Sequence, residues 1–123
     1  MTVPKNILRF EVLLYLSIMI DLPLSVFLHR EQLTTLSAGA AASVSLVVMI
    51  GLAAICSLVH LAARKRKNWA RWVLLCVQTL SAFSSLQAHG FSEFTTIDLS
   101  TTVLAFVGLY FSFTGDARGW FNR

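Results

Sequence analysis

Charged residues are scarce in this chain, since Asp, Glu, Lys and Arg together make up only 13% of its 123 residues. Water-soluble domains carry about 25% charged residues. Here 56% of the residues are hydrophobic, and the mean hydropathy is +0.71. This composition excludes an ordinary water-soluble domain and predicts an integral membrane protein.

Cysteine and catalytic motifs are scarce as well. Cys56 and Cys76 form no Cys-x-x-Cys pair and fall within apolar segments, so we expect them to pack as small apolar residues without a disulfide. No hydrolase, metalloprotease or nucleotide-binding motif is present. Only two of the three histidines are expected at a common depth in the membrane. We therefore expect a protein that is not an enzyme and that holds no metal and no cofactor.

Long apolar runs, by contrast, fill most of the chain. Four of them are bounded by charged or polar turn residues, at 7–28, 36–62, 69–88 and 94–113. A helix needs about 20 apolar residues to cross a bilayer, and none of the runs alternates as a membrane β-strand does. The first run lacks a small-x-small cleavage site near its end, so we expect a retained helix. The sequence predicts an all-α membrane four-helix bundle, formed by residues 1–123 as one domain with a basic turn at 63–68.

Four consecutive cations separate the second run from the third: Arg64, Lys65, Arg66 and Lys67. Lys and Arg near the ends of membrane spans stay on the cytoplasmic side. With a cytoplasmic N-terminus, nine of the ten Lys and Arg residues face the cytoplasm and only Arg30 faces outward. We therefore predict a bacterial inner-membrane protein with both termini in the cytoplasm. The four cations and Arg71 are expected to contact anionic lipid headgroups, not nucleic acid.

Acidic residues inside the apolar runs need a partner, because an ionisable group at depth costs several kcal/mol. Glu11 lies about one helical turn inside the cytoplasmic edge, near the depth expected for Arg71. We expect a structural ion pair between Glu11 and Arg71, or between Glu11 and Arg9.

Asp21 and Asp98 are expected at similar depths in the outer half of the membrane, and two interpretations remain open. Pro23 predicts a kink or break, so Asp21 could cap a shorter outer helical piece while Asp98 caps the start of the fourth helix. Alternatively, the two carboxyl groups share a proton or a cation. The same helix faces carry further polar candidates: Gln78, Thr101 and Thr102.

The second apolar run is rich in small residues at four-residue spacing. Candidates for helix packing or partner docking are Gly39, Ala42, Ser43, Ala53 and Ser57. Small residues let helix backbones approach closely in lipid. Because they occur on nearly every side, this helix is expected either to lie centrally in the bundle or to offer a surface to a second protein.

The basic turn, the stretch NWARWVLL at 68–75 and the tail FTGDARGW at 113–120 resemble a group of uncharacterised small four-helix proteins of the bacterial inner membrane. The resemblance covers most of the chain and implies the same fold but no known activity. In size, span number and cytoplasmic termini, the chain also resembles immunity proteins that block pore-forming toxins. Small multidrug resistance transporters differ, because their helix-one Glu lies among small residues, whereas Glu11 lies in RFEVLLYL near the interface.

These observations favour a non-catalytic protein that binds a membrane-embedded partner, or a second copy of itself, through its helices. Such a protein would serve as an accessory, regulatory or immunity subunit. The alternative is a small proton- or cation-coupled transporter or channel that uses Asp21 and Asp98.

Overall fold

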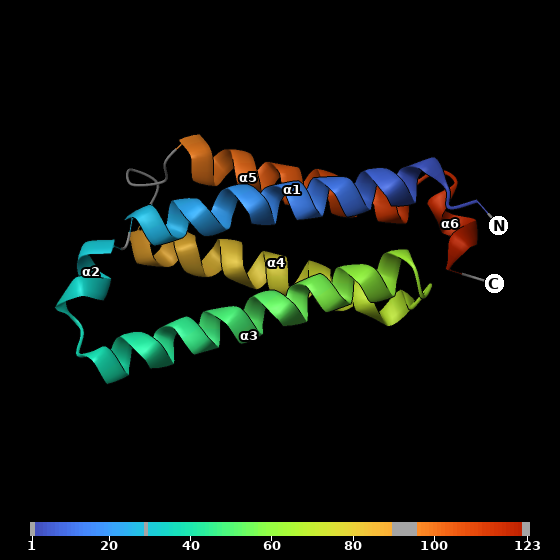
Figure 1. The fold of residues 1–123 in the computed structure, drawn as a ribbon. Coiled ribbons are helices and arrows are strands. Elements are labelled where there is room, and N and C mark those ends of the chain that lie inside the picture. The colour runs from blue at the N-terminus through green and yellow to red at the C-terminus, as the bar shows by residue number, and fades with distance from the viewer. Residues whose placement is uncertain (1, 29, 90–95, 122–123) are drawn as a thin grey trace.

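The computed structural model describes residues 2–28, 30–89 and 96–121, and all regular structure in these ranges is helical (Figure 1). Six helices follow one another along the chain: α1 (Lys5–Leu28), α2 (Arg30–Thr35), α3 (Ala38–Ala63), α4 (Asn68–His89), α5 (Thr96–Phe113) and α6 (Ala117–Trp120). Four of them are long, and α2 and α6 are short. The prediction of an all-α fold is therefore confirmed.

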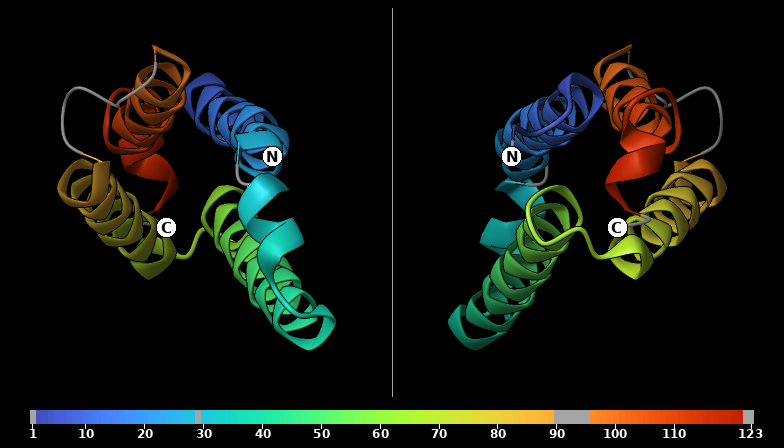
Figure 2. Two further views of the ribbon diagram at one scale, coloured as in Figure 1. Left: turned by 90° about the vertical axis from the view of Figure 1, so that its left-hand side faces the viewer. Right: turned by 90° about the vertical axis from the view of Figure 1, so that its right-hand side faces the viewer.

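The four long helices form a ring in the order α1, α5, α4, α3 (Figure 2). α1 and α5 are the most extensively packed pair, and the contacts of α3 with α1 and α4 are fewer. The beginning of α1 and the short helix α6 lie at the same end of the bundle (Figure 1). We call this the inner end, and the opposite end, where α2 lies, the outer end.

The long helices overlap the four apolar runs, with two differences in detail. α1 continues through Pro23 to Leu28, so no separate outer piece begins at Asp21. The two short helices α2 and α6 were not predicted, because six and four residues are too few to show a helical period. The expected start of the fourth run at residue 94 and the cation Arg123 lie outside the described residues.

The buried core lies at the inner end. Phe10 and Ile7 of α1 pack there with Val59 of α3 and Leu109 of α5, and all four are fully or almost fully buried. α6 contributes Ala117, and the packing extends to Phe121 beside it. The core therefore joins the beginning of α1 to the ends of α3 and α5.

Toward the outer end α3 diverges from the other helices (Figures 1 and 2). Its side chains between Ala42 and Gly51 are all exposed. Among the described residues, one helix, Ala38–Ala63, is long and apolar enough to cross a membrane, and Asp98–Phe113 is a shorter apolar helix. The expectation that four helices cross the membrane therefore stays a prediction.

Candidate functional site

The first turn of α1 is capped by a residue more than a hundred positions away. The Asp116 carboxylate accepts hydrogen bonds from the backbone N–H of Lys5 at 3.1 Å and of Asn6 at 3.4 Å. The Asn6 amide in turn donates to the carbonyl oxygen of Thr114 at 3.0 Å. Because the first N–H groups of a helix have no partner within it, and a negative charge favours that end, Asp116 serves as a tertiary N-cap.

The same tail also holds the end of α3. The indole N–H of Trp120 donates to the carbonyl oxygen of Ala63 at 3.1 Å, and the Arg66 guanidinium lies 4.0 Å from the centre of the Trp120 ring. A carbonyl in the last turn of a helix has no partner within it, so the indole satisfies a group that needs one. The tail FTGDARGW is therefore a clasp that joins α1, α3 and α5 at the inner end.

Glu11 forms its ion pair with Arg64 of the basic turn, not with Arg71. Its carboxylate lies 2.9 Å from one terminal nitrogen of Arg64 and accepts a second hydrogen bond from Nε at 3.1 Å. The predicted pair between Glu11 and Arg71 is wrong. Arg9 is not the partner either, since its guanidinium donates to the Asn6 side chain at 3.5 Å and lies 5.5 Å from the ring centre of Phe111.

Arg71 instead serves the end of α5. Its guanidinium donates to the carbonyl oxygen of Ser112 at 2.9 Å and lies 4.4 Å from the ring centres of Phe113 and Phe121. Arg118 donates to the carbonyl oxygen of Phe113 at 3.2 Å. Cations at a helix C-terminus are favourable because the unpaired carbonyls carry partial negative charge. Of the other cations in the basic turn, Lys65 and Lys67 are exposed and Arg66 is half-buried.

The outer carboxylates lie near the contact between α1 and α5. The Thr101 hydroxyl is 3.4 Å from Oδ1 of Asp21 and 3.1 Å from the backbone oxygen of Asp98, so its single proton can serve either acceptor. Asp98 lies within the first turn of α5, where the helix dipole favours a carboxylate. Asp21 does not begin a helix, so the predicted capping role for it is wrong.

The other polar candidates do not join this group. Gln78 of α4 and Thr102 of α5 are half-buried, and their side chains form no hydrogen bond with another residue in the described ranges. The structure therefore brings together Asp21, Thr101 and Asp98.

The five small residues of α3 that the sequence singled out are not buried within the chain. All five candidates, Gly39, Ala42, Ser43, Ala53 and Ser57, are exposed. The hydroxyls of Ser43 and Ser57 donate to backbone oxygens of their own helix, at 2.9 and 2.7 Å. The interpretation that this helix lies centrally in the bundle is therefore wrong.

The space around the glycines of α3 and α5 shows the same difference in packing. A Cβ added at Gly39 or Gly51 of α3 would meet no atom within 4 Å. A Cβ added at Gly108 of α5 would lie 3.1 Å from Cβ of Leu13 in α1. Gly108 is thus small because α1 packs against it, whereas no described part of the chain packs against Gly39 or Gly51.

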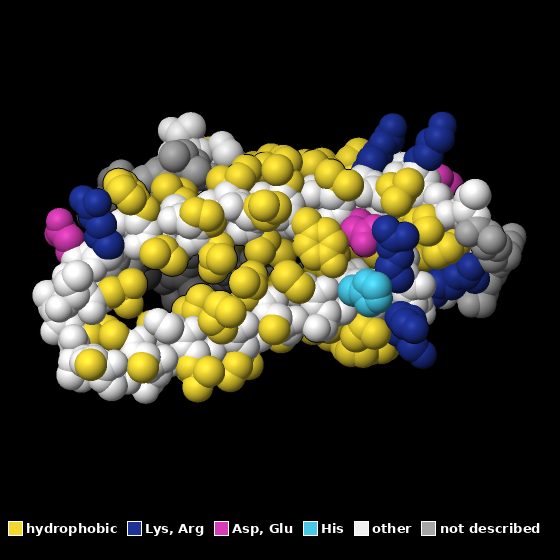
Figure 3. Space-filling view, viewed as in Figure 1, with side chains coloured by type: hydrophobic (Ala, Val, Ile, Leu, Met, Phe, Trp, Pro, Cys, Tyr) yellow, Lys and Arg dark blue, Asp and Glu magenta, His cyan; other side chains and the backbone are white. Residues whose placement is uncertain are grey.

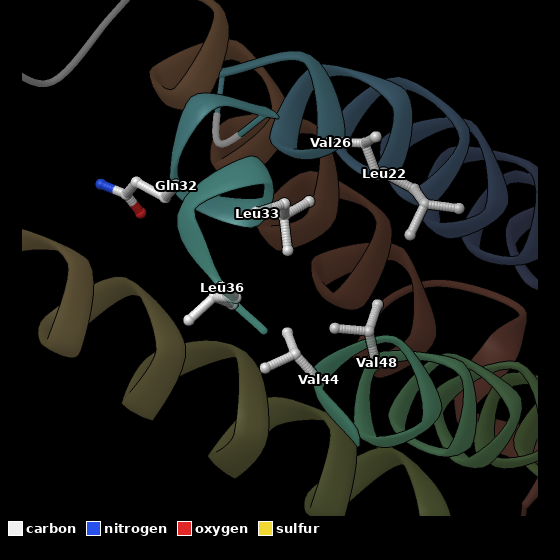
Figure 4. A pocket seen from close by; sticks show the side chains of 7 residues that line it. All are labelled: Leu22, Val26, Gln32, Leu33, Leu36, Val44 and Val48. Carbon is white, nitrogen blue, oxygen red and sulfur yellow. The ribbon is translucent and has the colours of Figure 1, made fainter. Parts of the chain in front are cut away.

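An apolar cavity of about 390 Å³ opens where α3 diverges from α1, and α2 lies across its outer end (Figure 4). Seven residues line it: Leu22, Val26, Gln32, Leu33, Leu36, Val44 and Val48. Gln32 is its one polar residue, and its amide points away from the other six side chains (Figure 4). A cavity with so few polar groups suits hydrocarbon and offers nothing to a charged or strongly polar ligand.

No protein-family model, curated protein or solved structure matches this chain. Within the described residues, no group of three or more His, Cys, Asp or Glu side chains is placed to hold a metal ion. The function must therefore be inferred from the geometry of the chain itself.

Proposed function

We propose that this protein is a non-catalytic inner-membrane protein that binds a membrane-embedded partner through α3. It crosses the bilayer as a four-helix bundle, with the inner end and both termini in the cytoplasm. Its role is that of an accessory, regulatory or immunity subunit.

The distribution of side chains supports the membrane location. Hydrophobic side chains cover the middle of the face shown in Figure 3, and the Lys and Arg side chains gather at the two ends, mostly at the inner end. Large apolar residues are exposed on every long helix, among them Met19, Met49, Leu80 and Tyr110, each more than 60% exposed. Such a surface is unfavourable in water and favourable in lipid.

The exposed outer part of α3 is the observation that carries the binding proposal. In the most apolar stretch of 18 residues in α3, only 6% of the stretch is buried within the chain. A helix that served only to complete this bundle would pack its small residues against a neighbour, as α5 packs Gly108 against α1. On α3 they remain available to a partner.

Purification from the native membrane in mild detergent tests the proposal, with mass spectrometry of the co-purifying proteins. Ile50→Trp adds bulk to α3 at a residue 61% exposed, so it should release the partner without unfolding the bundle. Leu80→Trp on α4 is the matched control, because Leu80 is 67% exposed. The proposal is wrong if the protein purifies as a monomer without any partner, or if both variants retain the partner equally.

The contact of Thr101 with Asp21 favours a second candidate function, a small proton- or cation-coupled transporter or channel. Asp21 and Asp98 would bind the ion, and Thr101 would orient the Asp21 carboxylate. Flux through liposomes containing the purified protein tests this function, with Asp21→Asn and Asp98→Asn as variants. Flux that both variants abolish would establish it, and absence of flux in the unaltered protein would reject it.

A further inference from the structure

Six exposed residues follow one side of α3 at alternating spacings of four and three: Gly39, Ser43, Leu46, Ile50, Ala53 and Ser57. We call them the α3 seam. At about 100° per residue, all six lie within about 60° of Ile50 around the helix axis. Val48, which lines the cavity, and Val59, which is buried in the core, lie on the opposite side of the helix.

The spacing of the seam is that of a helix pair. Apolar or small residues repeating every 3.5 positions keep one helix against another over several turns, with a crossing angle of about 20°. The seam spans about 27 Å at 1.5 Å per residue, close to the roughly 30 Å of the hydrocarbon core. Leu46 and Ile50 at its middle are 62% and 61% exposed. The seam is thus shaped for contact with one helix across most of the membrane.

The exposed area of the chain leaves room for such a contact. The structure exposes 8139 Å², whereas a compact monomer of this mass exposes about 6,600 Å². The surplus of about 1,500 Å² is nearly twice the roughly 800 Å² that each partner buries in a stable interface of standard size. Coverage of the seam would use only part of this surplus.

The residues of the seam match a second copy of themselves. In a parallel pair related by a two-fold axis, each residue meets its own counterpart. Small residues then face small residues near both ends, and Leu46 and Ile50 pack in the middle. The helix carries no charged residue between Ala38 and Val59, so it has no charge pattern that would select a different protein.

Charge at the inner end also permits self-pairing. Arg64 comes seven positions after Ser57 and therefore lies on the same side of the helix as the seam. Its charge is already compensated by Glu11 of its own chain, at 2.9 Å. Two copies side by side therefore do not bring two uncompensated guanidinium groups together. Nine of the ten Lys and Arg residues are predicted on the cytoplasmic side, so all copies should insert into the membrane with the same orientation. Two copies with the same orientation form a parallel pair.

From these observations we infer that the protein is a parallel homodimer in the membrane, joined along the α3 seam. This inference rests on the proposed function and names the partner as a second copy of the chain. The cavity at Val44 and Val48 faces away from the pair and remains open to lipid.

Disulfide crosslinking in native membranes tests the dimer. The two free cysteines, Cys56 and Cys76, are first replaced by alanine, and single cysteines are then placed at Ser43, Ile50 and Ser57. Val48→Cys is the matched control on the same helix, because Val48 is 46% exposed but faces the cavity. Chains of 13.6 kDa should form a band of twice that mass at the three seam positions, at least several-fold stronger than at Val48.

The possible outcomes separate the dimer from the proposed function. Crosslinks at the seam to a different protein, recognised by mass and mass spectrometry, would overturn the dimer and leave the partner-binding function standing. Equal crosslinking at seam and control positions would overturn the seam as the interface. Absence of any crosslink from α3 would overturn both the dimer and the proposed role of α3.

Discussion

Replacement of Gly115 by alanine tests the clasp at the inner end. Gly115 has a φ of +60°, and a Cβ at this position would lie 2.5 Å from Nδ2 of Asn6. The substitution therefore strains the backbone and also displaces the Asn6 amide, which donates to the carbonyl of Thr114. Both effects act on the turn that places Asp116 at the start of α1.

The size of the effect follows from these two contributions. A non-glycine residue in the left-handed region costs about 1–2 kcal/mol. Loss of the Asn6 hydrogen bond adds about 0.5–1.5 kcal/mol. We therefore expect Gly115→Ala to lower the free energy of unfolding by about 1.5–3.5 kcal/mol, before any loss of the Asp116 cap.

Reversible unfolding in mild detergent, followed by tryptophan fluorescence, measures this change. Gly119→Ala is the matched control, because a Cβ there meets no atom within 4 Å and Gly119 lies in α6 with no positive φ. In the background Asn6→Ala the Gly115→Ala effect should shrink to the backbone strain alone, about 1–2 kcal/mol. If Gly115→Ala and Gly119→Ala unfold alike, the tail does not clasp the helices as described.

Three further tests probe other contacts by the same unfolding measurement. Gly108→Ala should destabilise the bundle by about 1–3 kcal/mol, because the added Cβ would press on α1. Gly51→Ala should be neutral or stabilising by up to about 1 kcal/mol, because a Cβ there meets no other atom. Equal effects of the two substitutions would contradict the packing of α1 on α5. Trp120→Phe should cost about 0.5–1.5 kcal/mol through the lost hydrogen bond to α3, and an unchanged stability would exclude that bond. A double-mutant cycle of Glu11→Gln and Arg64→Gln should give a coupling of about 0.2–1 kcal/mol that falls with salt, since Arg64 is 46% exposed. A coupling below this range would contradict a stabilising ion pair.

Position along the bundle axis could be estimated from the sequence by residue counting, but position around the axis could not. Residue counting placed Glu11 and Arg71 at one depth, and it could not tell which helix α1 would face. The structure places the carboxylate against Arg64, because the α3 end of the basic turn lies beside α1. The same limit applies to α3, whose small residues on nearly every side did not reveal which side packs.

Hydropathy located the long helices because each apolar run is bounded by charges. The contact of the tail with α1 could not be predicted from the sequence. Asp116 caps α1 across 111 positions, whereas local capping rules compare residues only a few positions apart. In the structure Gly115 adopts the left-handed conformation that glycine takes up readily, in the turn before Asp116. Nothing in the sequence indicated that the turn would meet the beginning of α1.

The separation between Lys5 and Asp116 has a consequence for how the protein is made. The ribosome completes α1 long before it reaches Asp116, so the first turn of α1 must form without its cap. The loop that the cap closes includes every long helix, and closing so large a loop costs entropy that only packing of the long helices can offset. Assembly should therefore end with the cap, and chains interrupted before residue 116 should keep an uncapped first helix that proteases can attack.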